Sequence, residues 1–205
     1  MKKYPTIPRE IRKGIPIYGF DKLDGSNIRI EWSKKNSFHK FGSRKQLLSD
    51  DNPILKKAES IFLQKYSEDL ERIFRKQQWQ KAMAFVELWG QNSFAGNHEE
   101  DDEYTVTLFD IKKDKKGIIL PNEFLKLFSH LDIAKLLYQG NINEDLIRAV
   151  KNRELEGMTF EGIVCKASQY KTPGIPLMIK IKSDEWVEKL RKKCAGNQKL
   201  FEELL

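Results

Sequence analysis

Cysteine is scarce in this chain, which has only Cys165 and Cys194 among its 205 residues. Two cysteines far apart in the sequence form neither a zinc-binding pattern nor a disulfide framework. A reducing, intracellular setting is the simplest account of such a chain, so we expect a cytoplasmic protein. No apolar run is long enough to span a membrane, and residues 1–5 lack the apolar core of a signal peptide.

Charged residues are abundant, at 33% of the chain, and the formal net charge is +7 at pH 7. An excess of lysine and arginine fits a polyanionic partner such as nucleic acid, although a lysine-rich surface on any soluble domain explains the charge equally well. Hydrophobic residues make up 40%, which permits a sizeable core. We find no linker or internal repeat, and we expect a single domain over residues 1–205.

Short strands and helices alternate along the chain. Alternating or continuous apolar residues predict strands over residues 15–21, 27–32, 38–43, 82–90, 104–111, 160–166 and 176–182. Helical spacing predicts one long helix or two shorter ones over 53–78, further helices over 122–130 and 143–153, and a closing helix that starts near residue 184 with Ser183 as its cap. Several strands are neighbours of the hairpin kind, which favours an α+β fold of mainly antiparallel sheets flanked by helices.

Three features of the predicted strands are compatible with a functional site. Glu87 lies inside a strongly apolar run, where a carboxylate is costly unless it is paired or binds a metal. Lys180 and Lys182 share one face of their strand, a pattern that an ordinary solvated face also produces. Glu161 and Lys166 bracket an apolar strand with charges, which alone is a weak signal, and Phe109 by itself fits an ordinary core phenylalanine.

Read in order, the charged motifs resemble those of the covalent nucleotidyltransferase superfamily, which contains ATP-dependent DNA ligases, RNA ligases and mRNA capping enzymes. The resemblance covers about residues 15–183. Its motifs are Lys22-x-Asp24-Gly25-x-Asn27, Arg44, Glu87, Phe109-Asp110, Glu161-Gly162-x-Val164-x-Lys166 and Lys180-x-Lys182. No single motif is specific, but six in the expected order with sensible spacing are a strong signal.

Within the superfamily, the chain is most similar to the RNA ligase 2-like branch. DNA ligases and capping enzymes usually have arginine at the position of Asn27, and the segments 42–45 and 131–140 also look like that branch. About twenty residues follow Lys182, so we expect a nucleotidyltransferase (adenylyltransferase) domain without an OB-fold or a full C-terminal domain. An accessory protein or an oligomer could replace the missing part in engaging RNA.

The resemblance implies an ATP-dependent RNA ligase with its nucleotide pocket between the sheets. Such an enzyme takes AMP from ATP as a covalent lysyl-AMP, passes it to a 5′-phosphate, and joins that end to a 3′-hydroxyl, at RNA ends or in a nicked duplex, as in RNA repair. The implied catalytic residues are Lys22 as nucleophile with Glu161, Lys180 and Lys182. The implied ATP-binding residues add Leu23, Asn27, Arg44, Glu87 and Phe109. Mg²⁺ or Mn²⁺ is expected on Asp24, Glu87 and Glu161, through bound waters.

Elementary chemistry adds an expectation about Lys22. A lysine must be neutral to attack phosphorus, so we expect burial and nearby positive charge, from Lys180, Lys182 and a bound divalent metal, to lower its pKa. Lys166 lies five residues after Glu161, on the opposite face of a regular strand, and would reach the site only through a twist or bulge. Several basic residues could contact the phosphates of RNA, namely Arg12, Lys13, Lys45, Arg191, Lys192 and Lys193. For residues 191–193, a solvated helix face is the alternative.

Three other functions remain open from the sequence. A compact ATP-dependent DNA ligase would seal nicked DNA, and a capping guanylyltransferase would take label from GTP. A non-catalytic module that binds nucleotides or RNA ends is the alternative of a different class. Completeness of the motif set, from Lys22 to Lys182, argues against that last alternative.

Overall fold

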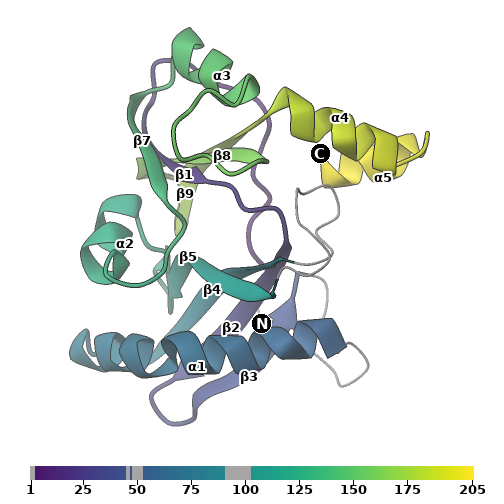
Figure 1. Cartoon of the computed structure of the whole chain (residues 1–205). Coiled ribbons are helices and arrows are strands. Elements are labelled where there is room, and N and C mark those ends of the chain that lie inside the picture. Colours follow the sequence, from purple (N-terminus) through teal and green to yellow (C-terminus); the bar gives the residue numbers. More distant parts are fainter. Residues whose placement is uncertain (1–2, 45–46, 48–52, 91–102) are drawn as a thin grey trace.

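Two antiparallel sheets, stacked with helices on their outer faces, form the protein (Figure 1). The computed structural model describes residues 3–44, 47, 53–90 and 103–205. The first sheet has the order β7-β1-β8-β9 and the second the order β3-β2-β4-β5-β6. Their strands are β1 Pro16–Asp21, β2 Ser26–Ser33, β3 Ser37–Ser43, β4 Lys81–Trp89, β5 Thr105–Lys113, β6 Gly117–Ile118, β7 Leu136–Asn141, β8 Gly162–Thr172 and β9 Ile175–Lys182. The expected α+β fold of antiparallel sheets is therefore confirmed.

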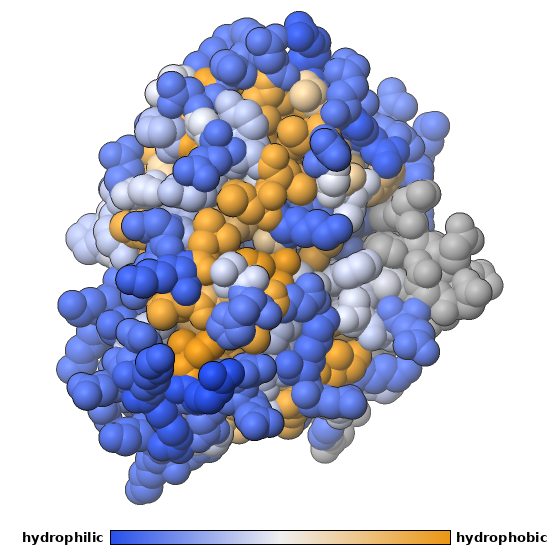
Figure 2. Space-filling view, turned by 60° about the vertical axis from the view of Figure 1, so that its left-hand side comes forward, coloured by the Kyte–Doolittle hydropathy of each residue, from blue (hydrophilic) through white to orange (hydrophobic). Residues whose placement is uncertain are grey.

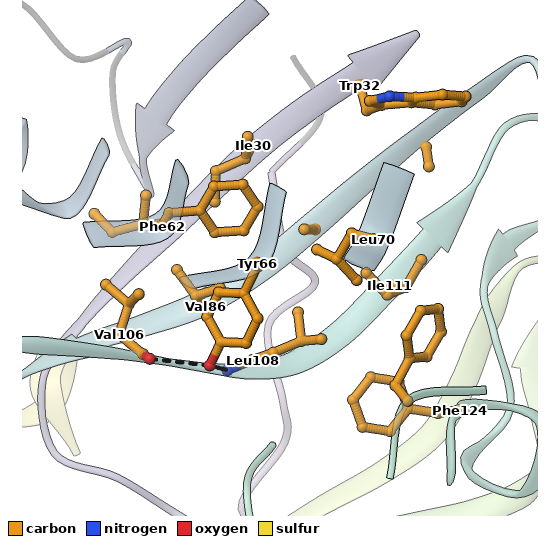
Figure 3. Close-up of a cluster of buried hydrophobic side chains, with 14 of the residues drawn as sticks. Ile30, Trp32, Phe62, Tyr66, Leu70, Val86, Val106, Leu108, Ile111 and Phe124 are labelled. Atoms are coloured by element: carbon orange, nitrogen blue, oxygen red, sulfur yellow. Dashed lines mark hydrogen bonds between the residues drawn. The ribbon is translucent and has the colours of Figure 1, made fainter. Parts of the chain in front are cut away.

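The long helix α1 (Pro53–Lys76) covers the outer face of the second sheet, and it is one helix rather than two. Its buried side chains pack against alternate residues of β2 and β4, which are Ile28, Ile30, Trp32, Ala84, Val86 and Leu88. Figure 3 shows Tyr66 in this core, with its hydroxyl at the backbone of β5. Its hydroxyl donates to the carbonyl oxygen of Val106 at 3.0 Å and accepts from the backbone nitrogen of Leu108 at 3.2 Å. Helix α1 is thereby tied to β5 by both apolar packing and hydrogen bonds.

A smaller core supports the outer face of the first sheet. The helix α3 (Glu144–Lys151) begins at Asn143, whose side chain accepts from the backbone nitrogen of Leu146. Its apolar residues Leu146, Ile147 and Val150 pack with residues of β1, β8 and β9. The helix α2 (Pro121–Phe128) adds Phe124 and Phe128 to the larger core.

The closing helix expected from the sequence is in fact two helices. α4 (Asp184–Lys193) is capped by Ser183 as expected, and α5 (Gln198–Leu204) follows with Asn197 as its cap. Between them Ala195 and Gly196 have φ values of 45° and 82°, in the left-handed region, which ends the first helix. The sequence also missed β6 and β7, because β6 is very short and β7 has little alternation in burial.

The faces that look between the two sheets carry the polar residues. On β9 the isoleucines 179 and 181 belong to the outer core, so Lys180 and Lys182 lie on the inner face. On β5 the regular alternation breaks, because a bulge lies opposite the step from Phe85 to Val86.

This bulge determines what β5 presents between the sheets. Leu108 and Ile111 both pack in the core between the second sheet and α1. The two consecutive residues between them, Phe109 and Asp110, both face the space between the sheets. The face shown in Figure 2 is mainly hydrophilic, apart from a hydrophobic band that crosses it. Within the described residues, no helix is both long enough and apolar enough to cross a membrane.

Candidate active site

Lys22 lies directly after β1, at the edge of the space between the two sheets. Its backbone nitrogen donates to the carbonyl oxygen of Gly162 at 2.9 Å, which ties the end of β1 to the start of β8. The buried Asp21 strengthens this join, because its carboxylate accepts from the backbone nitrogen of Thr159 at 3.0 Å and from its hydroxyl at 3.2 Å. The loop before β8 is thereby held beside Lys22.

Glu161 occupies the centre of the site. Its Oε2 lies 2.7 Å from Nζ of Lys22, and its Oε1 lies 2.8 Å from Nζ of Lys182. The carboxylate is 4% exposed, so both ion pairs are largely shielded from water. One buried carboxylate therefore holds two lysines, one directly after β1 and one on β9, within reach of the same small volume.

Gly162 explains how Glu161 reaches this position. Glu161 precedes β8, and Gly162 has a φ of 136°, a conformation that favours glycine. A Cβ at Gly162 would overlap the carbonyl oxygen of Ile181 on the neighbouring strand. The turn at Gly162 breaks the alternation that the sequence analysis assumed between Glu161 and Lys166.

Lys180 and Lys182 have the lowered pKa values in this site. Burial, assisted by the positive charges of Lys22 and Arg9, lowers the pKa of Lys180 to about 8. Burial also lowers the pKa of Lys182 to about 7, against the opposing effect of Glu161. Nζ of Lys182 further lies 3.6 Å from the centre of the Trp186 ring and donates to the carbonyl oxygen of Leu204 at 3.2 Å.

Burial and the two lysines of β9 do not by themselves lower the pKa of Lys22, and that part of the expectation is wrong. Burial does disfavour the ammonium, but the carboxylates of Glu161, Glu87 and Asp24 outweigh it and raise the pKa of Lys22 above its ordinary value. Lys22 is therefore a protonated, ion-paired lysine before any nucleotide binds. The sequence could not reveal this, because the ion pair with Glu161 joins residues 139 positions apart.

Glu87 faces Asn27 across the pairing of β2 and β4. Burial raises its pKa to about 8, and the negative charges of Glu161 and Asp24 act in the same direction. The side-chain oxygen of Asn27 is also buried without a hydrogen-bond partner in the structure. Both groups are of the kind that a positively charged or hydrogen-bond-donating ligand can satisfy.

The carboxylates expected to bind metal, Asp24, Glu87 and Glu161, all raise the pKa of Lys22. The described part of the chain nevertheless contains no group of three or more His, Cys, Asp or Glu side chains arranged to hold an ion. A cation held by one or two carboxylates, its own waters and phosphate oxygens fits this arrangement, and Mg²⁺ is commonly bound in that way. The predicted ligands Asp24, Glu87 and Glu161 thus fit a water-mediated site completed by a nucleotide. Their role remains a prediction.

Phe109 and Asp110 lie further along the space between the sheets. The Phe109 ring is partly exposed, and its carbonyl oxygen accepts from Nζ of Lys166 at 2.7 Å. Lys166 also forms a buried ion pair with Asp110 at 2.9 Å. Lys166 thus binds the strand that carries Phe109, and it contacts neither Lys22 nor Glu161.

The remaining predicted residues lie around this centre. Leu23 is partly buried beside Lys22, and Arg44 is exposed after β3 but lies close enough to help lower the pKa of Lys180. Lys45 lies outside the described residues, and so do residues 98–102 of an acidic segment, residues 98–103, that the sequence predicts to be a surface loop. The sequence analysis missed Tyr4, whose hydroxyl donates to Asp110, because no local pattern connects residues so far apart.

Comparisons with known proteins agree with this geometry. A family model described as RNA ligase matches residues 15–182, which is most of the chain and runs from β1 to the end of β9. A search of curated proteins gave no match.

Solved structures of similar fold include an archaeal ATP-dependent RNA ligase and several Naegleria gruberi RNA ligases. The archaeal structure has a TM-score of 0.66 and 17% identity, covering 100% of this chain and 56% of the other. A Naegleria gruberi variant with ATP and Mn has a TM-score of 0.63 and 17% identity, covering 91% and 59%. Another, with PPi, has a TM-score of 0.61 and 18% identity, covering 88% and 53%. This chain therefore spans little more than half of each protein, and the identity supports a shared fold.

Proposed function

The chain belongs to the RNA ligase family, and from this premise we propose that it uses ATP to adenylylate Lys22 as the first step of joining RNA ends. The observation that carries the proposal is the carboxylate of Glu161 shared between Lys22 and Lys182, at 2.7 and 2.8 Å. An ordinary structural ion pair needs one lysine. Here a nucleophile and a second cation are held at the same carboxylate, with Lys180 on the same strand face.

In the proposed reaction, a bond forms between Nζ of Lys22 and the α-phosphorus of ATP. The bond from that phosphorus to the oxygen bridging to the β-phosphate breaks, and pyrophosphate leaves with its electron pair. Lys22 starts protonated, and Glu161 is 2.7 Å away, so its Oε2 takes the first lysine proton and frees the nitrogen lone pair. The second proton, lost as the bond to phosphorus forms, leaves on pyrophosphate. The product is lysyl-AMP on Lys22.

The lysines of β9 act on the phosphates. Lys180 and Lys182 lie on the inner face and bring positive charge to the α-phosphate as its charge grows in the transition state. Arg44 offers a planar fork suited to phosphate oxygens. A divalent cation bound with the triphosphate, near Asp24, Glu87 and Glu161, would add positive charge beside the phosphates and offset the carboxylates around Lys22. A Naegleria gruberi RNA ligase variant was solved with ATP and Mn, which supports a divalent cation that binds together with ATP.

The base and sugar are bound by the second sheet. Phe109 is partly exposed on the inner face and stacks on adenine, while Glu87 and Asn27 face each other across β4 and β2 and accept or donate to the ribose. Burial raises the pKa of the Glu87 carboxyl to about 8.

Labelling with ATP tests the first step. The protein is incubated with α-labelled ATP and Mg²⁺ and then denatured and separated by electrophoresis, and we expect label to stay on the chain. Lys22→Arg should take no label although it can keep the ion pair with Glu161, because a guanidinium stays protonated. Lys171→Ala, at an exposed lysine on β8, is the matched control and should label normally. A folded wild type without label would refute the proposal.

Transfer and joining are tested with defined ends. We expect AMP to pass from Lys22 to a 5′-phosphate on RNA, followed by attack of a 3′-hydroxyl. Sealing is compared on a nicked RNA duplex, a nicked DNA duplex and single-stranded RNA. Joining of DNA nicks alone would instead identify a compact DNA ligase.

A further inference from the structure

The amino-terminal segment, residues 3–15, forms no helix or strand, yet it contacts the inner faces of both sheets. Tyr4 lies at its start. The Tyr4 hydroxyl donates to Oδ2 of Asp110 on β5 and lies 3.3 Å from the sulfur of Met178 on β9. One side chain therefore connects the two sheets in the space between them.

The Tyr4 ring also packs against aromatic residues of the second sheet. Its centre lies 5.0 Å from that of Phe85 and 5.2 Å from that of Phe109, with interplanar angles of 69° and 84°. Edge-to-face contacts of this kind fix the relative orientation of rings more strongly than apolar contact alone. Phe109 is thus held by Tyr4 at its ring and by Lys166 at its carbonyl oxygen.

The same segment continues to the phosphate-binding side of the site. The carbonyl oxygen of Pro8 accepts from the backbone nitrogen of Lys180 at 3.4 Å, on the edge strand β9. Arg9 adds positive charge beside Lys180, and its guanidinium donates to the carbonyl oxygen of Glu202. Residues 4–9 therefore extend from the aromatic end of the site to its lysines.

We infer that Tyr4 is a positioning residue of the nucleotide pocket, which holds the Phe109 ring and the Asp110–Lys166 pair in the arrangement that binds the base. This inference rests on the proposed function, because it assigns the base to Phe109. Residues 4–9 are then one wall of the pocket rather than a dispensable tail.

The hydroxyl and the ring of Tyr4 have separable effects. Burial and the nearby Asp110 raise the pKa of Tyr4 well above its ordinary value, so the hydroxyl stays protonated and donates. Tyr4→Phe removes only that donor, and Asp110 keeps its ion pair with Lys166. Tyr4→Leu also removes the aromatic edge that orients Phe109, so its effect on base binding should be larger.

The test measures nucleotide binding by the full chain with and without a base. Binding of ATP and of inorganic tripolyphosphate is measured by calorimetry, and the rate of self-labelling is followed as ATP concentration varies. We expect Tyr4→Leu to raise the ATP concentration for half-maximal labelling about threefold to tenfold, and Tyr4→Phe about threefold, with smaller changes in the maximal rate. Tripolyphosphate binding should not change, because that ligand has no base.

Tyr170→Phe is the matched control, since Tyr170 is 43% exposed and lies far along β8 from the site. Equal weakening of ATP and tripolyphosphate binding in Tyr4→Leu would mean a general structural role and would overturn the inference, as would unchanged ATP binding. If Tyr4→Leu does not fold, the weakening of ATP binding is compared with that of tripolyphosphate binding in Tyr4→Phe instead. A wild type that binds ATP but takes no label overturns the proposed function. The calorimetric comparison of ATP binding with tripolyphosphate binding still decides the role of Tyr4.

Discussion

Replacing Glu161 by glutamine removes one negative charge that two lysines share. Glu161 is 4% exposed, and its partners Lys22 and Lys182 have side chains 23% and 8% exposed. Breaking a buried ion pair typically costs about 3–5 kcal/mol, and glutamine keeps the shape and some hydrogen bonding, so we take about 3 kcal/mol. For a chain of this size that corresponds to a melting temperature lowered by about 6–12 °C.

The same change should alter the chemistry in a defined direction. Without Glu161 the pKa of Lys22 falls, because the carboxylate that raises it most is gone. The pH profile of self-labelling should therefore move to lower pH, while the maximal rate falls about 100-fold because the proton acceptor is lost. Labelling rates between pH 6 and about pH 9, measured with the melting temperature, test both effects.

Glu185→Gln provides the control for removing a carboxylate from an ion pair. Glu185 pairs with Arg153 at 2.6 Å, but the two side chains are 49% and 35% exposed. An exposed pair contributes about 0–1 kcal/mol, so the melting temperature should change by only a few degrees and labelling should not change. If Glu161→Gln behaves like Glu185→Gln, the shared carboxylate has neither the structural nor the chemical role assigned to it.

Three further predictions concern Glu87, Gly162 and Cys165. The pKa of Glu87 is raised from 4.5 to about 8 in the folded protein, so its contribution to stability is present below about pH 4.5 and is lost as pH rises through 8. The wild type should therefore lose stability relative to Glu87→Gln, by on the order of 1–3 kcal/mol, as pH is raised from 5 to 8. Urea titrations without nucleotide measure this difference in the free energy of unfolding. Gly162→Ala should nearly abolish labelling and lower the melting temperature, because a Cβ there overlaps the carbonyl oxygen of Ile181. Gly14 also has a positive φ but open space around it, so Gly14→Ala should cost only about 1–2 kcal/mol of stability. Equal effects of the two substitutions would contradict the role of close packing at Gly162. Burial raises the pKa of Cys165 to about 12, so alkylation at pH 8 should be slow in the folded protein and fast in denaturant, and rapid labelling of the native thiol would disagree with its burial.

Much of the fold follows from local patterns along the chain. The alternation of Ile179 and Ile181 with Lys180 and Lys182 correctly predicted that the two lysines share one face of β9, because a strand sends successive side chains to opposite faces wherever it lies. The apolar spacing after Pro53 predicted helix α1, and Ser183 capped α4 for the reason its side chain suggested. The family resemblance also came from the sequence, since the order of motifs needs no coordinates.

Other features required the tertiary structure. The bulge in β5 turns both Phe109 and Asp110 inward, and a strict alternation would have sent one of them to the outer core. The break between α4 and α5 depends on left-handed backbone at Ala195 and Gly196, which helical spacing does not reveal.

The chemistry of the site divides in the same way. The sequence determined which residue types are present: the lysine proposed as nucleophile, the carboxylates and the two lysines of β9. Only the tertiary structure decided that Glu161 is shared by Lys22 and Lys182, that Lys166 binds Asp110 instead, and that Tyr4 reaches Phe109. The physical reason is that charge and packing act through space, so the pKa of Lys22 depends on neighbours that the chain brings close only when it folds.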